Sequence, residues 1–280
     1  MNGTKEKSRS ITVEMICEIL GICSVVLLIV ALPIFRVNLD EEWISYFNNI
    51  LIGLAVGFAG IIVTITAVQK ALENQAIKNE KIEEYKKILR YSKYAKVLIS
   101  KYILYFNYVV TPENKLQKMP TDNFCNDFIL SDLKDIYKLN VLLTEPLNTP
   151  IVFGFFNIEK ELYDYFLRMN EEIDFKYSNE LSVMLNEYFK NTNEYDSRNS
   201  IIGWYKDEQY RVIAYNMCDM LNKYPERDFE KEFDENDESL SSNSITQIIM
   251  LFKLMKFQKV GIEKYLAIVE KIEESLMELE

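Results

Sequence analysis

The chain has 280 residues, a formal net charge of −11 and no histidine. The lack of histidine excludes every catalytic or metal site that needs an imidazole, including Ser-His-Asp triads and H-E-x-x-H zinc sites. The charge is uneven: residues 1–110 carry 13 basic and 10 acidic residues, and the remainder carries 19 basic and 33 acidic. An acidic part of this size argues against general nucleic-acid binding, which depends on a basic field.

Two apolar segments follow a short N-terminal tail, residues 1–15. They cover about 16–35 and 46–68, and a short turn at 36–42 separates them. About twenty residues of helix cross a hydrocarbon core of roughly 30 Å. The sequence therefore predicts a two-helix transmembrane hairpin. A secretory signal peptide would explain the first segment alone, but no small-x-small cleavage site follows it. A buried hairpin of a soluble protein is the other alternative.

Basic residues predict the orientation of this hairpin. The tail before the first segment and the region after the second are rich in lysine and arginine, whereas the turn holds one arginine and three acids. Basic residues favour the cytoplasmic side of a membrane. We therefore expect a multi-pass protein of the bacterial inner membrane with both termini in the cytoplasm.

The second apolar segment carries three glycines, Gly53, Gly57 and Gly60, about one helical turn apart. In lipid, small residues with this spacing let two helix backbones approach closely. The partner is open at this stage: it is either another copy of the chain or the first apolar helix. The further alternative is that the three glycines have no packing role, since glycine is common in membrane helices.

A few polar residues lie in or beside the hairpin. Ionisable and amide groups at membrane depth usually face a partner or water. Such groups would line a pore or an interface if several hairpins associate, and interfacial solvation is the alternative for the glutamates. The candidates are Glu14, Glu18, Asn48 and Asn49.

Residues 69–110 lack glycine and proline and predict a long connecting helix. Its middle carries a basic stripe, defined as Lys86, Arg90, Lys93 and Lys96, with three tyrosines interleaved. The stripe would hold an anionic ligand or a partner, with the tyrosine rings available for stacking on a base. Contact with anionic lipid and pairing with acidic helices of the same body are the two alternatives.

Residues 111–280 predict a cytosolic α-helical domain. We expect helices over 131–143, 158–175, 179–190 and 201–224, an acidic loop at 226–243 and a long C-terminal helix at 245–280. The only strand-like stretch is "TPIVFGFF" (149–156). The apolar repeat at the end of the last helix fits either a coiled-coil seam or a helix that closes a monomeric bundle. The predicted fold class is all-α, with an N-terminal transmembrane hairpin and a cytosolic helical bundle.

No motif for catalysis is found. A phosphate-binding loop needs clustered glycines, and the glycines beyond residue 68 are isolated. The four cysteines have no C-x-x-C spacing and give no metal-ligand cluster. We therefore expect no enzyme and no cofactor.

In architecture alone, the chain resembles bacterial two-transmembrane abortive-infection and antiphage effectors. That resemblance implies a homo-oligomer that perturbs the membrane lipid when a cytosolic sensor is triggered by a protein or by a phosphate-bearing small molecule. The alternative is a membrane-tethered scaffold or regulator that binds a cytosolic protein partner.

Overall fold

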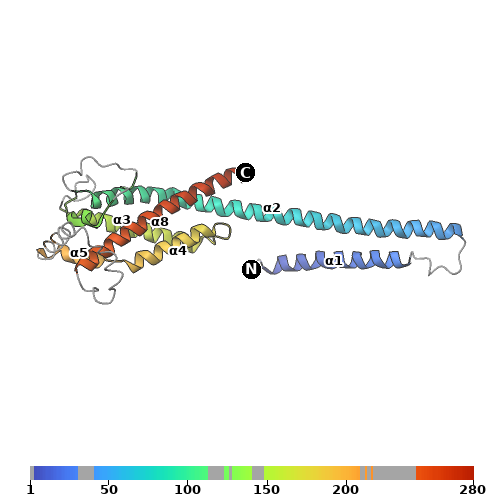
Figure 1. Cartoon of the computed structure of the whole chain (residues 1–280). Helices are drawn as coiled ribbons and strands as arrows, with labels where there is room; N and C mark the ends of the chain where they lie inside the picture. The colour runs from blue at the N-terminus through green and yellow to red at the C-terminus, as the bar shows by residue number, and fades with distance from the viewer. Residues whose placement is uncertain are drawn as a thin grey trace. The chain divides into compact units, whose positions relative to one another are not determined.

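The computed structural model describes residues 3–30, 41–112, 123–125, 128–140, 148–208, 212, 216 and 244–280. For residues 3–14, 41–44 and 244–245 the structure describes the helical backbone and not the side chains. The described residues form helices and no strand, apart from one antiparallel bridge between Leu139 and Pro150 (Figure 1). The prediction of an all-α fold is confirmed.

The chain divides into two compact units, Met1–Glu80 and Lys81–Glu280. The helix α2 contributes its first part to one unit and its last part to the other. The helices are α1 (Gly3–Val30), α2 (Glu41–Val110), the short 3-10 helix η3 (Leu130–Asp135), α3 (Ile151–Glu172), α4 (Asn179–Glu194), α5 (Arg198–Tyr205) and α8 (Ser244–Leu279).

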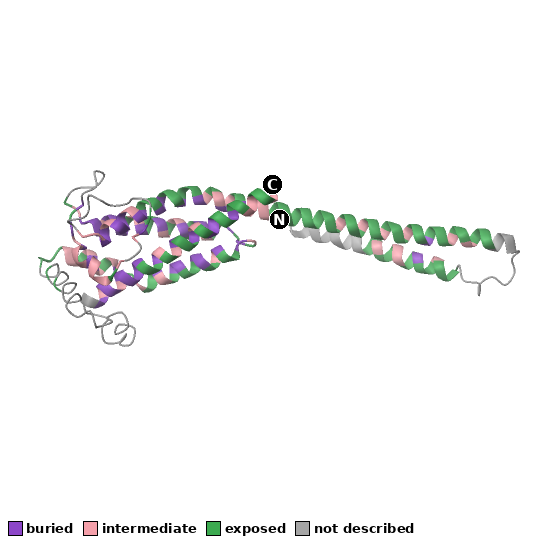
Figure 2. Cartoon of the chain, turned by 45° about the horizontal axis from the view of Figure 1, so that its top comes forward, coloured by how far each residue is buried: buried purple, intermediate pink, exposed green. Residues whose placement is uncertain are grey.

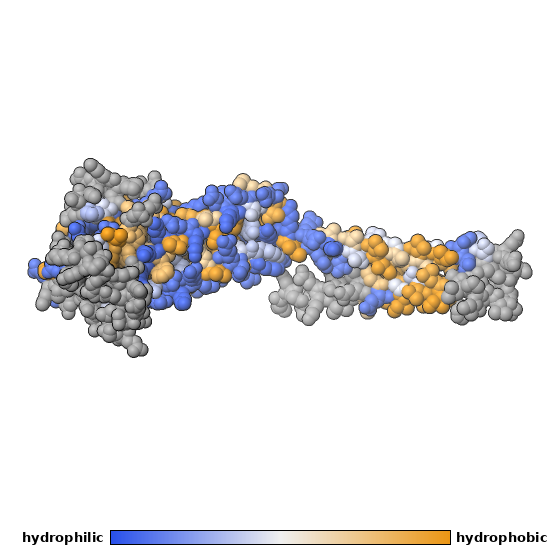
Figure 3. Space-filling model, in the orientation of Figure 1, coloured by the Kyte–Doolittle hydropathy of each residue, from blue (hydrophilic) through white to orange (hydrophobic). Residues whose placement is uncertain are grey.

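The first unit consists of α1 and the first part of α2, and most of their described residues are exposed (Figure 2). Large apolar side chains are exposed along α1 and along α2 as far as Val68, and much of this surface is orange in Figure 3, whereas residues 69–80 are mostly polar. In the part of the chain described, α2 is the one helix long and apolar enough to cross a membrane, and only 6% of its most apolar window is buried. A helix in a soluble core would be mostly buried there.

Of the two predicted membrane-spanning helices, only α2 is long and apolar enough in the described residues. The apolar part of α1 in the described residues, Met15–Val30, is shorter than a span requires. Residues 31–35 of the predicted first span lie outside the described residues, as does most of the predicted turn, 36–40.

The second unit has an aromatic core between the last part of α2 and the helices α3, α4 and α8. Its largest fully buried side chains include Tyr102, Phe106, Phe155, Phe166 and Tyr265. Neighbouring rings meet at centroid distances of about 5 to 6 Å, mostly tilted or edge-to-face. The core thus joins residues more than 150 positions apart in the sequence.

The apolar repeat of α8 packs inside its own unit. Ile262, Tyr265 and Val269 are fully buried, and Ile272 is nearly so. Leu276 and Leu279 are partly buried against the same core. The repeat therefore closes the helical bundle of its own unit. Its residues are not exposed, as the seam of a coiled coil with another chain would be.

The α-helix predicted over 131–143 is wrong for its described residues, 131–140, and residues 141–143 lie outside the description. The chain forms only η3 and then becomes extended, with the Asn140 N–H donating to Thr149 O at 2.7 Å and the Ile151 N–H donating to Lys138 O at 3.0 Å. The ammonium of Lys138 is buried and donates to the carbonyls of Val109, at 3.0 Å, and Thr111 at the end of α2. These tertiary contacts override the local helical pattern.

Two further boundaries differ from the prediction. The stretch "TPIVFGFF" is not a strand, because α3 begins at Ile151 directly after Pro150, a residue suited to a helix start. Of the helix predicted over 201–224, residues 201–205 belong to α5, which ends at Tyr205. Residues 208, 212 and 216 are also helical, and the other residues from 209 to 224 lie outside the described residues. The acidic loop 226–243 also lies outside them.

Candidate functional site

In the first unit, α1 packs on one defined face of α2. The Ser24 hydroxyl on α1 donates to Ala55 O at 3.0 Å, and both residues are buried. A Cβ placed on Gly21 would lie 3.9 Å from Ile62 Cδ1, which is ordinary van der Waals contact. Small residues therefore bring the two helices together here, and a hydroxyl joins them.

The three predicted glycines lie on a different face. At about 100° per residue, Gly53, Gly57 and Gly60 fall within about 60° of one another, roughly opposite Ala55 and Ile62. A Cβ added to any of the three would meet no atom within 4 Å. The first apolar helix is therefore not their partner in the described residues. We call this surface the glycine face.

Two hydroxyls in this part of α2 are satisfied within the helix. Thr64 lies on the glycine face, and its hydroxyl donates to Gly60 O at 2.8 Å. Thr66 lies on the side of Ala55 and Ile62, and its hydroxyl donates to Ile62 O at 2.9 Å. Hydroxyls bonded to their own helix add no unsatisfied polar group to an apolar environment.

The predicted pore or interface groups do not form one cluster. The contacts of Ser24 and Gly21 show that α1 runs antiparallel to α2. Glu18 therefore lies level with residues beyond Ile62, whereas Asn48 and Asn49 lie near the other end of the hairpin. Glu18 and Asn49 are exposed, Asn48 is half-buried, and the side chain of Glu14 lies outside the described residues.

The basic stripe of α2 faces the end of α8. Lys86 Nζ lies 2.8 Å from Glu280 Oε1, and Lys96 Nζ lies 4.0 Å from Glu273 Oε2. The hydrogen bond to Glu280 raises the pKa of Lys86. The two ends of the stripe thus pair with acids of the same body. Among the described residues, Arg90 and Lys93 in its centre are exposed and form no ion pair or hydrogen bond.

The interleaved tyrosines make contacts within the same body, although the Tyr94 side chain stays 47% exposed. Tyr85 is buried in the core. Tyr91 donates to the Glu172 carboxylate, and Tyr94 donates to Glu161 Oε1 at 3.0 Å; both rings also contact Tyr165 of α3. These hydrogen bonds raise the pKa of both phenols. Tyr91 and Tyr94 therefore attach α2 to α3, and a role of these rings in ligand binding stays a prediction.

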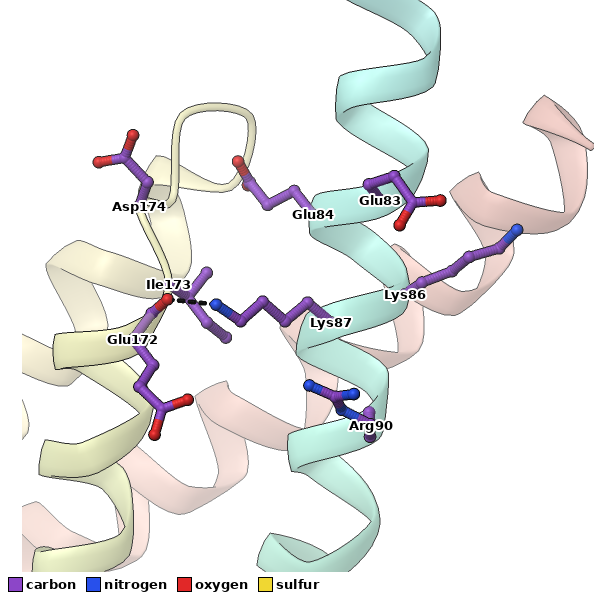
Figure 4. A pocket seen from close by; sticks show the side chains of 8 residues that line it. All are labelled: Glu83, Glu84, Lys86, Lys87, Arg90, Glu172, Ile173 and Asp174. Carbon is purple, nitrogen blue, oxygen red and sulfur yellow. Dashed lines mark hydrogen bonds between the residues drawn. The ribbon is translucent and has the colours of Figure 1, made fainter. Parts of the chain in front are cut away.

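Two hollows lie beside the stripe. The first, of about 500 Å³, lies between α2 and the α3–α4 loop and has acidic and basic walls. In Figure 4, Lys87 reaches across it to the carbonyl of Glu172, whereas Lys86 points away towards the opposite side of α2. Glu84 fixes the loop by accepting from the backbone N–H of Tyr177 at 3.1 Å and from the Ser178 hydroxyl.

The second hollow lies between α2 and α8 and has a volume of about 410 Å³. We call it the α2–α8 groove. All four residues of the basic stripe line it against one acid, Glu273, so that its lining has a formal charge of +3. Its remaining lining residues are Leu89, Ser92 and Leu276. The four predicted stripe residues therefore share one surface hollow.

A buried polar network in the second unit was not predicted. Glu159 is fully buried on α3 and pairs with the guanidinium of Arg198. Gln258 Nε2 donates to Glu159 Oε1 at 2.9 Å, and its carbonyl accepts from the Tyr102 hydroxyl at 2.8 Å. Burial raises the pKa of Glu159, while Arg198 and Gln258 oppose the rise. Glu159 occupies an apolar-periodic stretch, which is a sequence signal for a buried acid.

Two of the three glycines of the second unit have packing roles, whereas a Cβ on Gly203 would meet no atom within 4 Å. A Cβ on Gly154 would lie 2.2 Å from a ring carbon of Tyr105, and one on Gly261 would lie 3.0 Å from Tyr188 Cδ2. Glycine at these positions lets a tyrosine ring lie against a helix backbone.

Comparison with protein-family models, with curated proteins and with solved structures finds no match to the chain.

Proposed function

We propose that the chain is a membrane effector of the bacterial inner membrane. In this proposal α1 and the first part of α2 cross the membrane as a hairpin, copies of the hairpin associate through the glycine face, and the helical body lies in the cytoplasm as a sensor. Association perturbs the membrane when the sensor is triggered.

The observation that carries the proposal is the unoccupied glycine face. α1 contacts α2 on the opposite side, and nothing lies within 4 Å of a Cβ placed on Gly53, Gly57 or Gly60. Large apolar side chains around this face are exposed, as a lipid-facing helix requires. Without water, close backbone packing at small residues is a main source of helix association. A second copy of the hairpin satisfies this requirement.

The two-pass topology rests on sequence and charge. The apolar run of α1 continues beyond Val30 as "ALPIF" (31–35), which gives it the length of a span. Lysines and arginines before α1 and after the apolar part of α2 favour cytoplasmic placement of both ends.

Permeabilisation of bacteria expressing the protein tests the proposal. Dye entry and membrane depolarisation are measured for the full chain, for a chain lacking residues 1–69 and for Gly57→Leu. The control is Val63→Phe, an enlargement at a position that is 68% exposed and lies outside both the glycine face and the α1 contact. We expect leakage from the full chain and Val63→Phe, and intact membranes with the other two.

Other outcomes would contradict the effector. Leakage that persists in Gly57→Leu at an equal membrane level removes the role of the glycine face. Intact membranes in every strain, together with full function after the hairpin is replaced by an unrelated anchor, would favour the tethered scaffold.

A further inference from the structure

We propose that the α2–α8 groove binds a small phosphate-bearing polyanion, which replaces the carboxylates of Glu273 and Glu280 as the counter-ion of the basic stripe. This inference deepens the proposed function, because it assigns a ligand class to the sensor. Its test measures binding and not leakage, so the two proposals fail separately.

The charge balance of the stripe is the first argument. Lys86, Arg90, Lys93 and Lys96 follow one another at intervals of three or four residues, a spacing at which like charges on a helix repel. The acids of α8 lie at the two ends only. Among the described side chains, the centre of the stripe has no compensating partner in hydrogen-bond reach. An anion bound there would relieve this repulsion.

The geometry of the groove is the second argument. Arg90 and Lys93 are separated by roughly 4.5 Å along the axis of α2, at 1.5 Å per residue. One phosphate group can therefore contact both side chains. A guanidinium binds phosphate with two parallel hydrogen bonds, and an ammonium adds a compact charge. The groove is large enough, at about 410 Å³, for a second phosphate that reaches Lys86 or Lys96.

The surroundings restrict the kind of ligand. The groove offers Leu89 and Leu276 as its apolar surface, and its lining holds no aromatic ring. The tyrosines of the stripe are engaged on the α3 side of α2. Ser92 Oγ lies 2.9 Å from the buried Tyr265 hydroxyl and also bonds Ile88 O. Recognition therefore depends on phosphate groups and not on a stacked base.

The ion pairs of α8 make the site competitive. Lys86, Lys96 and both acids are about half exposed, so these pairs are weak and exchange readily with other ions. A polyanion that reaches the end lysines must displace Glu273 and Glu280. Ligand binding thereby releases the contact between the end of α8 and α2, which gives the sensor two states.

Pyrophosphate binding to the full chain, measured by titration calorimetry in zwitterionic nanodiscs at about 100 mM salt, tests the proposal. We expect binding to the native chain and about tenfold weaker binding to Arg90→Gln/Lys93→Gln. The matched control is Lys160→Gln/Lys190→Gln, which removes the same charge from two exposed lysines outside the groove and should bind as the native chain does.

The counter-ion step has its own variant. Glu273→Gln removes the carboxylate that pairs with Lys96 and makes the charge of the groove more positive by one, so the affinity for pyrophosphate should rise about threefold. An unchanged or weaker affinity would overturn the displacement of the α8 acids. The absence of pyrophosphate binding to the native chain, or equal loss in the groove variant and its control, would overturn the site itself.

Nanodiscs with anionic phosphatidylglycerol separate the two sources of phosphate. If the native ligand is a lipid headgroup, the headgroups occupy the groove and pyrophosphate binding to the native chain is lost in these discs. If the ligand is a free polyanion, its affinity in anionic discs stays close to that in zwitterionic discs. In both cases Arg90→Gln/Lys93→Gln distinguishes the groove from non-specific attraction.

Discussion

Large apolar side chains are exposed in the first part of α2 and buried in its last part. In the first unit the large apolar residues Leu54, Val56 and Val63 are 47–68% exposed, whereas in the second unit Leu98, Tyr102 and Phe106 are fully buried. One continuous helix therefore has a largely exposed apolar surface, covered by α1 on one side only, at one end and a packed core at the other. The difference shows that apolar content alone does not define a core. In the proposed function a bilayer provides the apolar environment for the first part.

The core of the second unit contains a buried acid, Glu159, with Arg198 and Gln258 as its partners. Removing the acid by Glu159→Ala leaves the guanidinium and the amide without their acceptor, so we expect a loss of about 3–5 kcal/mol in the stability of the body. Thermal unfolding of the full chain in detergent measures the effect. An unchanged midpoint would show that the network is dispensable.

The pH dependence of stability tests the raised pKa of the buried Glu159. Burial raises the pKa of Glu159, so between its ordinary pKa and the raised one the folded chain binds more protons than the unfolded chain. The contribution of Glu159 to stability is therefore fully present below the ordinary pKa and is lost as pH rises through the raised pKa. Relative to Glu159→Gln, the native chain should lose stability over that range. A constant difference between the two proteins would contradict the shift.

An identical substitution in the two parts of α2 tests the comparison directly. Leu98→Ala opens a cavity in the core and should cost about 3 kcal/mol. Leu54→Ala removes the same atoms from an exposed position in the same helix and should cost less than about 1 kcal/mol. The midpoints of thermal unfolding of both variants are compared. Equal losses would mean that Leu54 also belongs to a protein core.

A charge on the exposed apolar surface distinguishes lipid from water. Val56→Lys places an ammonium in the most apolar part of α2, which should cost about 2.5–3 kcal/mol if this part crosses a bilayer. On a helix surface in water the same change should cost no more than about 0.5 kcal/mol. The fraction of protein that resists alkaline extraction from membranes reports the result. Full retention in the membrane would argue against a lipid-facing Val56.

The smallest expected effect concerns the contact between α1 and α2. Ser24→Ala removes the hydrogen bond to Ala55 O, and hydrogen bonds between membrane helices contribute only about 0.6 kcal/mol on average. We therefore expect a small decrease in the unfolding midpoint, with Thr66→Ala as a control that removes a bond within α2. A loss of several kcal/mol would mean that Ser24 has a further role.

The sequence predicts features that depend on local patterns. The helices, the glycine spacing and the basic stripe follow from periodicity, and the groove gathers all four stripe residues. The sequence cannot predict which side of α2 accepts α1, because several small residues suit either contact. Ser24 and Ala55 decide this by packing.

Features that depend on distant contacts could not be predicted. Lys138 and Asn140 end the helical pattern after η3 through bonds to other segments. Tyr91 and Tyr94 face α3 because acids of α3 accept their hydroxyls. The start of α3, in contrast, depends on a local signal that the sequence contains. Pro150 before an apolar run indicates the start of a helix, and this signal outweighs the β-branched residues that follow.

The central claim, that the glycine face joins two copies of the hairpin, is tested most directly by cysteine cross-linking in isolated membranes. In a chain whose four native cysteines are replaced, Thr64→Cys places a thiol on the glycine face, and Val63→Cys places one on an exposed neighbouring side. We expect oxidation to give a disulfide-linked dimer rapidly with Thr64→Cys and slowly with Val63→Cys. Equal rates, or monomer in both variants, would contradict the claim.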